Sequence, residues 1–514
     1  MTRSDITSTS ASKAQYEQKL SRSLSLRGNV LITLSSVTPA SSVFIIIPAV
    51  LAAIGGASFV AFLIAAVVGV FMAFCYAELA SAFPIAGGEY SFVARVLGKA
   101  TGFALFLMNT LSIILIIGVI ALGTGEYLAA AVSGADTKWA GVVVILLSAV
   151  VAVLNIRTNA WVTGTFLAVE MAALVVLSVL GFINVSRPVT TLFHAQTVGD
   201  GGVVVGVALG LVAAQTATAL FAYNGYGAAV YFAEETRDAA RGMAKVILWS
   251  LAITVAAEII PMTAVILGAP DLATLLGSDS PMQYFVTARG GSVLNTIVSL
   301  GIALAIINAV VAITLQGGRT VFGSARDRAY PDRISAFLGY VHPRLQTPLP
   351  ATLLVGVAAA VVAAIVPIGA LITATGATVV ALYLLVALSA IVGRRNGTTA
   401  HAKYRMPAWP LAPLLVIAAL GYVTYQLWIG NPAQVLIAVG ALVVGYVYYF
   451  AYLYAQRDTR WTMPDAPFDE HAVLAEEASA RAVEEPGGLL AGPALELEIP
   501  TVDHPHGGRD RDAP

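Results

Sequence analysis

Charged residues are scarce in this chain. Asp, Glu, Lys and Arg make up 11% of the 514 residues, whereas apolar residues make up 58%. Soluble globular domains carry about 25% charged residues, so the composition excludes that class. The formal net charge of −1 also argues against a nucleic-acid partner, because such proteins are usually basic in patches.

Residues that build metal centres and catalytic sites are equally few. The single cysteine, Cys75, lies in an apolar run, which excludes a disulfide framework and a thiolate metal cluster. The apolar runs contain no metal-ligand spacing, nucleophile elbow or phosphate-binding loop. We therefore expect no metal, no cofactor and no enzymatic activity.

Long apolar runs dominate the sequence instead. A helix needs roughly 20 apolar residues to cross the hydrocarbon core of a bilayer, and we count twelve runs of about this length within residues 28–455. The sequence therefore predicts an all-α polytopic membrane protein with twelve transmembrane helices in a lipid bilayer. Residues 1–27 and 456–514 are polar, and we expect a cytoplasmic N-terminal segment and a disordered cytoplasmic tail.

The basic residues predict the orientation of the chain. If the N-terminus is inside, all but three of the 28 Lys and Arg lie in cytoplasmic segments; the exceptions are Lys138, Arg187 and Arg289. Cytoplasmic loops of membrane proteins are rich in these residues. Both termini are therefore expected in the cytoplasm.

Two of the predicted spans are interrupted in the middle. The first is interrupted at SSVTPASS (residues 35–42) and the sixth at AYNGYG (residues 222–227). Lipid tolerates unwound backbone only where protein or a cavity covers it, and paired broken spans are typical of transporters built from inverted repeats. We predict a five-plus-five inverted repeat, with repeat one at about 28–184, repeat two at about 202–392 and two additional helices at about 409–454.

Several sequence motifs resemble those of one transporter family. They are AELASAFPIAGGEY (residues 77–90), FAYNGY (221–226) with AEET (233–236), and SARDRAYP (324–331) with HPRLQTP (342–348). In this order they are similar to the motifs of the amino acid-polyamine-organocation (APC) transporters, and the resemblance covers about residues 25–455. It implies a permease for an amino acid or a related amine.

A broken helix offers partners for both charges of an amino acid. Its half-helix N-terminus exposes N–H groups that suit a carboxylate, and the preceding helix end exposes carbonyls that suit an ammonium. The candidate substrate contacts in the first break are Thr38, Ala40, Ser41 and Ser42. The family usually has Gly-x-Gly here, so the extra Cβ atoms would narrow the pocket. Alternatively, Ser41 and Ser42 only satisfy the kinked backbone beside Pro39.

For the second break, the resemblance implies five substrate-site residues: Phe221, Ala222, Tyr223, Asn224 and Gly225. The first three would direct carbonyls at the substrate amine, and the last two would form the unwound link. Tyr223 and Tyr226 are also gate candidates, with ordinary packing as the alternative. Many members of the family carry an acidic residue where this chain has Gly227, which disfavours a substrate with a cationic side chain.

Two acidic residues, Glu170 and Glu258, fall deep within predicted spans. At 1.5 Å per residue they lie roughly 13 and 18 Å from the start of their helices. Ionisable groups at this depth are costly and are functional candidates, and burial favours the neutral form of a carboxyl group, so either could carry a proton. Family members often have a lysine near position 170, so their coupling mechanism cannot be transferred. The alternative for both residues is a hydrogen-bonded structural role.

The sequence favours a secondary transporter that imports a small amino acid or related amine by alternating access. Proton symport is favoured, because the predicted span around Asn308 lacks the hydroxyl residues of a sodium site. We expect the protein in a bacterial cell membrane. Two alternatives stay open: an exchanger of amino acids, amines or polyamines, and a membrane sensor of the same fold that binds without transport.

Overall fold

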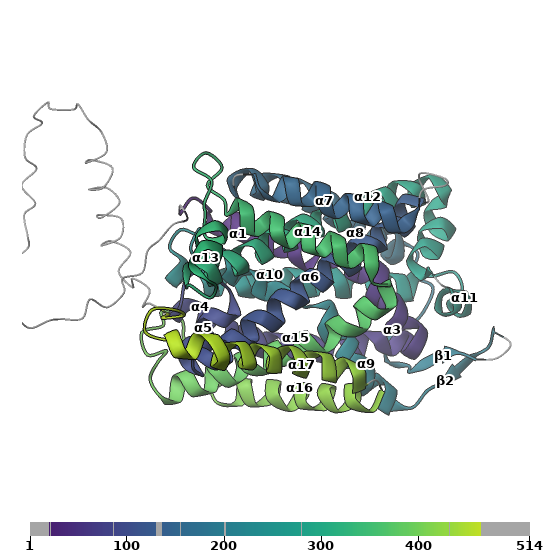
Figure 1. The fold of residues 1–514 in the computed structure, drawn as a ribbon. Helices are drawn as coiled ribbons and strands as arrows, with labels where there is room; N and C mark the ends of the chain where they lie inside the picture. Colours follow the sequence, from purple (N-terminus) through teal and green to yellow (C-terminus); the bar gives the residue numbers. More distant parts are fainter. Residues whose placement is uncertain are drawn as a thin grey trace, which may run out of the picture. The chain divides into compact units, whose positions relative to one another are not determined.

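The computed structural model of the protein describes residues 20, 22–85, 87–129, 136–154, 156–199, 202–278, 280–430 and 432–463. Most of these residues are helical (Figure 1). Most of the predicted N-terminal segment (1–19 and 21) and of the predicted tail (464–514) lies outside the described residues.

The first half of the chain starts with a helix in pieces. These are α1 (Leu26–Val37), α2 (Pro39–Ser41), the π-helical turn η1 (Ser42–Ile46) and α3 (Ile47–Ile54), followed by the 3-10 turn η2 (Gly55–Ala57). The next helices are α4 (Ser58–Ala82), α5 (Glu89–Val96), α6 (Lys99–Ala129), α7 (Thr137–Ala152) and α8 (Ile156–Ile183). The 3-10 turn η3 (Val189–Phe193) then leads to an antiparallel hairpin of β1 (Gln196–Val198) and β2 (Val204–Gly206).

The second half also starts with an interrupted helix. It consists of α9 (Leu209–Ala222) and the 3-10 helix η5 (Tyr226–Phe232). The remaining helices are α10 (Ala239–Gly268), α11 (Leu272–Gly277), α12 (Pro281–Arg326), α13 (Asp332–Leu338), α14 (Leu349–Ile365), α15 (Ile368–Arg395), α16 (Leu411–Gly430) and α17 (Pro432–Tyr448), then η6 (Tyr449–Leu453) and η7 (Tyr454–Gln456). Within α12 the backbone leaves the helical conformation at Gly291.

Eight helical stretches among the described residues are long and apolar enough to cross a membrane. One of them, 57 residues long, runs from Leu26 to Ala82 and therefore contains both the interrupted first helix and α4. Two further apolar helices, Lys138–Ala152 and Leu349–Ile365, are shorter. The chain is a multi-pass, mostly helical membrane protein.

The helices of the described chain form one unit with two distinct ends in Figure 1. The hairpin β1–β2 lies at one end together with α3 and α11, and β1 packs against both of these helices. Helices α5 and α13 lie at the opposite end. We call the first the hairpin end and the second the terminal end, because Trp461, near the last described residue, packs beside α5 there.

The described chain remains packed beyond the predicted start of the tail at residue 456. Trp461 is only 1% exposed and belongs to a buried aromatic cluster with Tyr90, Phe103 and Phe106. The predicted boundary is therefore too early, since the packed chain continues to Met463. The sequence did not indicate this boundary because the segment is mostly polar. Its one large apolar ring, that of Trp461, is buried by residues that are distant in sequence.

The first helix is interrupted at Thr38 because a proline follows it. Proline has no N–H and disfavours helical backbone at the preceding residue. Thr38 takes the left-handed conformation, with φ 48° and ψ 70°, and its N–H bonds to the carbonyl of Leu34, which ends α1. Helix α2 then begins at Pro39, where a missing N–H costs nothing.

The second break lies directly against the first. Gly225 has φ 117°, and an added Cβ there would lie 3.0 Å from the Cα of Val37 at the end of α1. Across the breaks, the Ser42 hydroxyl donates to the carbonyl of Ala222 at 3.1 Å. Both breaks lie within one buried apolar cluster, so their unwound backbone is covered by protein, as a membrane interior requires.

We expect Gly225→Ala to destabilise the protein by about 1–3 kcal/mol, because alanine is strained at this positive φ and its Cβ would press on the backbone of α1. The measurement is the thermal unfolding midpoint in detergent. Gly421→Ala is the matched control, because Gly421 lies within helix α16 with nothing within 4 Å of its added Cβ. Equal midpoints for the two variants would show that the contact between the breaks is loose.

Candidate functional site

Glu170 of α8 binds the start of the half-helix that follows the first break. The backbone N–H of Ala40 donates to its Oε1 at 2.8 Å, and the hydroxyl of Thr38 donates to the same oxygen at 3.3 Å. Thr38 Oγ1 also lies 2.8 Å from Ser41 Oγ. A carboxylate suits a helix N-terminus, where N–H groups are unpaired and the helix dipole is positive. A side chain of the protein therefore holds the position at which the sequence predicts a substrate carboxylate.

The other predicted buried acid, Glu258 of α10, faces the same break from another side. Glu258 is fully buried. Ser42 and Glu170 lie close enough to its carboxyl group to interact with it electrostatically. Neither of its oxygens has a hydrogen-bond partner, nor does Oε2 of Glu170. Buried polar atoms without partners are costly. The fold thus brings together two acids that lie far apart in sequence.

At the second break, most of the predicted carbonyl groups have partners within the protein. The carbonyl of Phe221 accepts the N–H of Asn224 at 3.0 Å, and that of Ala222 accepts the hydroxyl of Ser42. The Asn224 side chain accepts a hydrogen bond from the hydroxyl of Tyr383 on α15. The predicted residues of the two breaks therefore contact one another, and the site is closed in this conformation.

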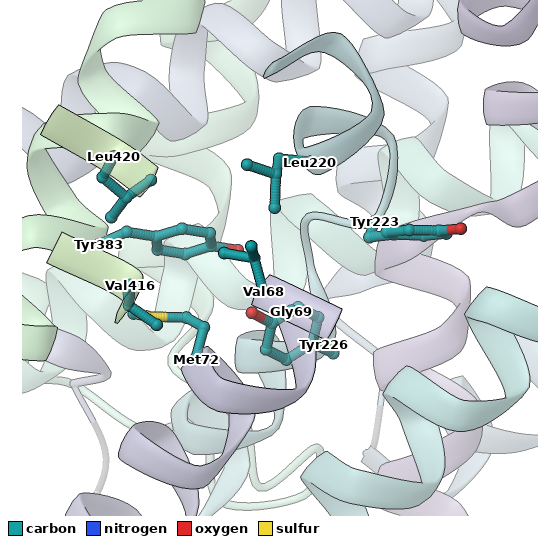
Figure 2. A pocket seen from close by; sticks show the side chains of 9 residues that line it. All are labelled: Val68, Gly69, Met72, Leu220, Tyr223, Tyr226, Tyr383, Val416 and Leu420. Atoms are coloured by element: carbon teal, nitrogen blue, oxygen red, sulfur yellow. The ribbon is translucent and has the colours of Figure 1, made fainter. Parts of the chain in front are cut away.

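A small apolar cavity lies beside the second break (Figure 2). Its lining comes from α4, α9, α15 and α16 and from the break itself: Val68, Gly69, Met72, Leu220, Tyr223, Tyr226, Tyr383, Val416 and Leu420. None of these residues belongs to the first break, where the N–H donors lie. The lining of the cavity therefore includes residues of the second break but none of the first break.

The two gate candidates occupy different surroundings. The Tyr223 hydroxyl donates to the carbonyl of Phe62 at 3.2 Å, and its ring packs edge-on against the Phe62 ring. Figure 2 shows Tyr223 directed away from Tyr226 and Tyr383, whose hydroxyl ends turn toward each other. Tyr223 thus has the contacts of a packing residue. Tyr226 lies in a cluster with Tyr76 and Tyr383, next to the cavity.

One buried acid, Glu89, is not among the site residues that the sequence predicted. Glu89, the first residue of α5, accepts hydrogen bonds from the hydroxyls of Tyr76 on α4, at 3.0 Å, and of Tyr231 on η5. Asn109 of α6 donates to Tyr231 at 2.7 Å. Burial raises the pKa of Glu89 to about 7, and the hydrogen bonds from Tyr231 and Tyr76 limit the rise. The glutamate of the GGEY sequence at the end of the first family motif was the signal by which this buried acid could have been found.

Buried ion pairs close the terminal end of the bundle. Arg319 of α12 contacts both carboxylate oxygens of Glu235, at 2.9 and 3.0 Å, and both side chains are almost fully buried. Arg326 pairs with Glu234 at 2.7 Å. Removal of one partner of a buried ion pair leaves the other charge buried and uncompensated, which is strongly destabilising. These pairs hold the segment after η5 against α12.

Asn308 joins helices close to the first break. Its Nδ2 donates to Ser35 Oγ at 2.9 Å and to the carbonyl of Thr163 at 3.3 Å. The contacts tie α12 to α1 and α8. Together with Glu170, they position α8 against the interrupted helix.

The sequence also matches a known protein family. The profile described as "Amino acid permease" matches residues 24–452, which include both breaks and Glu170 and Glu258. The chain belongs to the amino acid permease family. The resemblance drawn from the motifs is thereby confirmed, and the family and its relatives are transporters rather than enzymes.

The chain is similar along most of its length to several bacterial transporters. It is 26% identical to the methylthioribose transporter of Bacillus subtilis over 463 residues, which cover 85% of this chain and 95% of the relative. It is 25% identical to a branched-chain amino acid permease of the same organism, over 76% of this chain and 85% of the relative. It is 30% identical to an uncharacterized transporter of Mycobacterium tuberculosis, over 67% and 74%.

The family motifs take part in the contacts that close the permease. The motif AELASAFPIAGGEY begins directly after Tyr76, leads from α4 into α5 and contains Glu89. The motif FAYNGY forms the second break. AEET supplies Glu234 and Glu235, and SARDRAYP supplies Arg326 at the end of α12. Within the described residues, no group of three or more His, Cys, Asp or Glu could hold a metal ion.

Protonation of Glu89 should make the stability of the permease depend on pH. Because its pKa is raised from 4.5 to about 7 in the folded state, its stabilising contribution is complete below about pH 4.5 and is lost as the pH rises through about 7. The thermal midpoint of the wild type should fall between about pH 5 and about pH 8 more steeply than that of Glu89→Gln. Parallel pH profiles would contradict a titrating Glu89, because all other ionisable groups are shared.

Proposed function

We propose that the protein is a secondary active transporter that imports a small amino acid or related amine together with a proton, by alternating access. We further propose twelve transmembrane helices with a five-plus-five inverted repeat, both termini in the cytoplasm, and a location in a bacterial cell membrane. Membership in the amino acid permease family supports transport of such a substrate. The contact between Glu170 and Ala40 carries the proposal for coupling.

The proposed coupling follows from competition between two carboxylates for one helix N-terminus. When Glu170 is ionised, its Oε1 occupies the Ala40 N–H, and its negative charge repels the carboxylate of an incoming amino acid. A proton on Glu170 removes that charge and weakens its hold on the N–H, because hydrogen bonds to charged groups are stronger than those to neutral ones. The substrate carboxylate then binds the freed N–H group, so proton and substrate travel together.

Two observations support a small substrate without a cationic side chain. The residues at the first break, Ala40, Ser41 and Ser42, are buried and closely surrounded, so the space beside them is limited. An added Cβ at Gly227 would lie 2.8 Å from the ring of Tyr76, so an acidic side chain at this position would not fit. The chain therefore lacks the acid that many family members offer to a cationic substrate.

Two alternatives are tested by the same experiments. An exchanger would move labelled substrate only against unlabelled substrate on the other side. A membrane sensor would bind substrate without moving it. The names of the relatives widen the choice of compounds, since one is a methylthioribose transporter and another a branched-chain amino acid permease.

We expect a proton gradient, acid outside, to drive accumulation of substrate in proteoliposomes, and Glu170→Gln to abolish that accumulation. The glutamine is permanently neutral, so substrate binding and exchange of labelled for unlabelled substrate should continue. The measurement is uptake of a labelled panel of amino acids, amines and methylthioribose, with and without the gradient.

Glu258→Gln is the matched control, since it neutralises the other buried acid of the site. Gradient-driven accumulation that survives in Glu170→Gln but not in Glu258→Gln would move the coupling role to Glu258. Wild-type uptake that is the same with and without the proton gradient would favour an exchanger. Substrate binding without any uptake would favour a membrane sensor.

A further inference from the structure

The chain that follows η7 folds back against the terminal end of the bundle. The ring of Trp461 stacks on Tyr90, with ring centroids 5.3 Å apart and planes 28° apart, and packs edge-on against Phe103 at 5.2 Å. Only 1% of its surface is exposed. A buried tryptophan of this kind contributes a large apolar area to whatever contact it makes. We call residues Arg460, Trp461, Thr462 and Met463 the strap.

Hydrogen bonds hold the strap at defined positions on two elements. The backbone N–H of Trp461 donates to the carbonyl of Asp327 at 2.8 Å, and its Nε1 donates to the carbonyl of Lys99 at 2.9 Å. Arg460 contacts Asp332 at 2.9 Å through Nη2. Lys99 is the first residue of α6. Asp327 directly follows α12, and Asp332 is the first residue of α13. The strap therefore fastens the start of α6 to the end of α12.

The backbone of the strap is held in an uncommon conformation. Trp461 and Met463 have φ angles of 51° and 54°, a region that residues other than glycine rarely occupy. Such a conformation persists only where surrounding contacts compensate for its strain. The contacts of the Trp461 ring and N–H groups provide that compensation, so the docked form depends on the terminal end being assembled.

The strap also contacts the polar groups that close this end. Asp327, whose carbonyl accepts the Trp461 N–H, pairs with Arg326 through its side chain at 3.1 Å and accepts a hydrogen bond from the Tyr90 hydroxyl at 3.2 Å. Arg326 in turn pairs with Glu234. The same residues thus bind the strap and hold α12 against the segment after η5.

We propose that the strap is a latch that stabilises the conformation closed at the terminal end, so that its release favours opening there. Separation of α12 from α5 and α6 would pull apart the two sets of partners that Trp461 joins. This inference rests on the proposed alternating access, in which the terminal end must open once in each cycle. It assigns a regulatory contact to the beginning of the C-terminal segment, where any factor that displaces Trp461 would change the balance between conformations.

Two truncations test the latch with the bundle otherwise intact. One ends after Gln456 and removes the strap, and the other ends after Ala466, the last residue of the compact unit, and keeps it. Both are made with Cys75→Ala and Ala229→Cys. The side chain at position 229 is fully buried in η5, whose carbonyl there accepts the Asn29 amide of α1, so a thiol reagent reaches it only when this end opens.

We expect the truncation after Gln456 to be labelled by a maleimide about tenfold faster than the truncation after Ala466, a size typical of coupling between sites. The truncation after Ala466 should match the full-length chain. Equal labelling rates in the two truncations would overturn the proposal. The readout needs no transported substrate, so it stays informative even if the proton-coupled import proposed above fails.

Point variants separate the latch from simple loss of stability. Trp461→Ala and Arg460→Ala should both speed labelling, and Arg460→Ala leaves the buried ring in place, so it tests the latch even if Trp461→Ala does not fold. Arg457→Ala is the matched control, because Arg457 is an exposed arginine that precedes the strap and stacks on the exposed ring of Tyr454. A lower thermal midpoint in Arg460→Ala with an unchanged labelling rate would show a purely structural segment and contradict the latch.

Discussion

The whole site depends on covering unpaired backbone groups at two helix breaks inside an apolar bundle. The hydrocarbon core of a bilayer does not supply water to such groups, so each exposed N–H and carbonyl needs a partner from the protein. Glu170 supplies the partner for Ala40, and Ser42 supplies one for Ala222. Gly225 allows the breaks to approach because it has no Cβ to meet Val37. Contacts that complete the fold are therefore the same contacts that a substrate would replace in the proposed mechanism.

Because the same contacts serve both purposes, the proposed mechanism links the stability of the protein to transport. In the proposed mechanism a substrate that binds the half-helix N-terminus competes with Glu170, and a proton on Glu170 shifts this competition toward the substrate carboxylate. Glu258 adds a second carboxyl group whose oxygens have no hydrogen-bond partner. In the described site one oxygen of Glu170 is hydrogen-bonded and the other is not, whereas neither oxygen of Glu258 has a hydrogen-bond partner. An imbalance of this kind suits a site that exchanges one set of partners for another.

The terminal end is held by a different kind of interaction. Arg319 and Glu235 are almost fully buried, and a buried ion pair is costly to separate even where it adds little net stability. Such pairs favour two discrete arrangements, paired and apart, over intermediate ones. The network of Glu89 with Tyr76 and Tyr231 lies at the same end and links α4, α5 and η5. Glu89, whose pKa is raised to about 7 by burial, therefore lies among the contacts that the proposed opening of this end would rearrange.

The sequence by itself determined the class of the protein, the positions of the two breaks and the family. These follow from local properties: apolar runs are long enough to span a bilayer, proline stops a helix beside Thr38, and glycine permits the turn at 225. Only the tertiary structure decided that Glu170 bonds to Ala40, that Glu258 faces the same break, and that Tyr223 turns toward Phe62. It also showed that Trp461 is buried and that Glu89 lies in a hydrogen-bond network. The physical reason is that these contacts join residues far apart in the chain, so their partners depend on how whole helices pack and not on any local pattern.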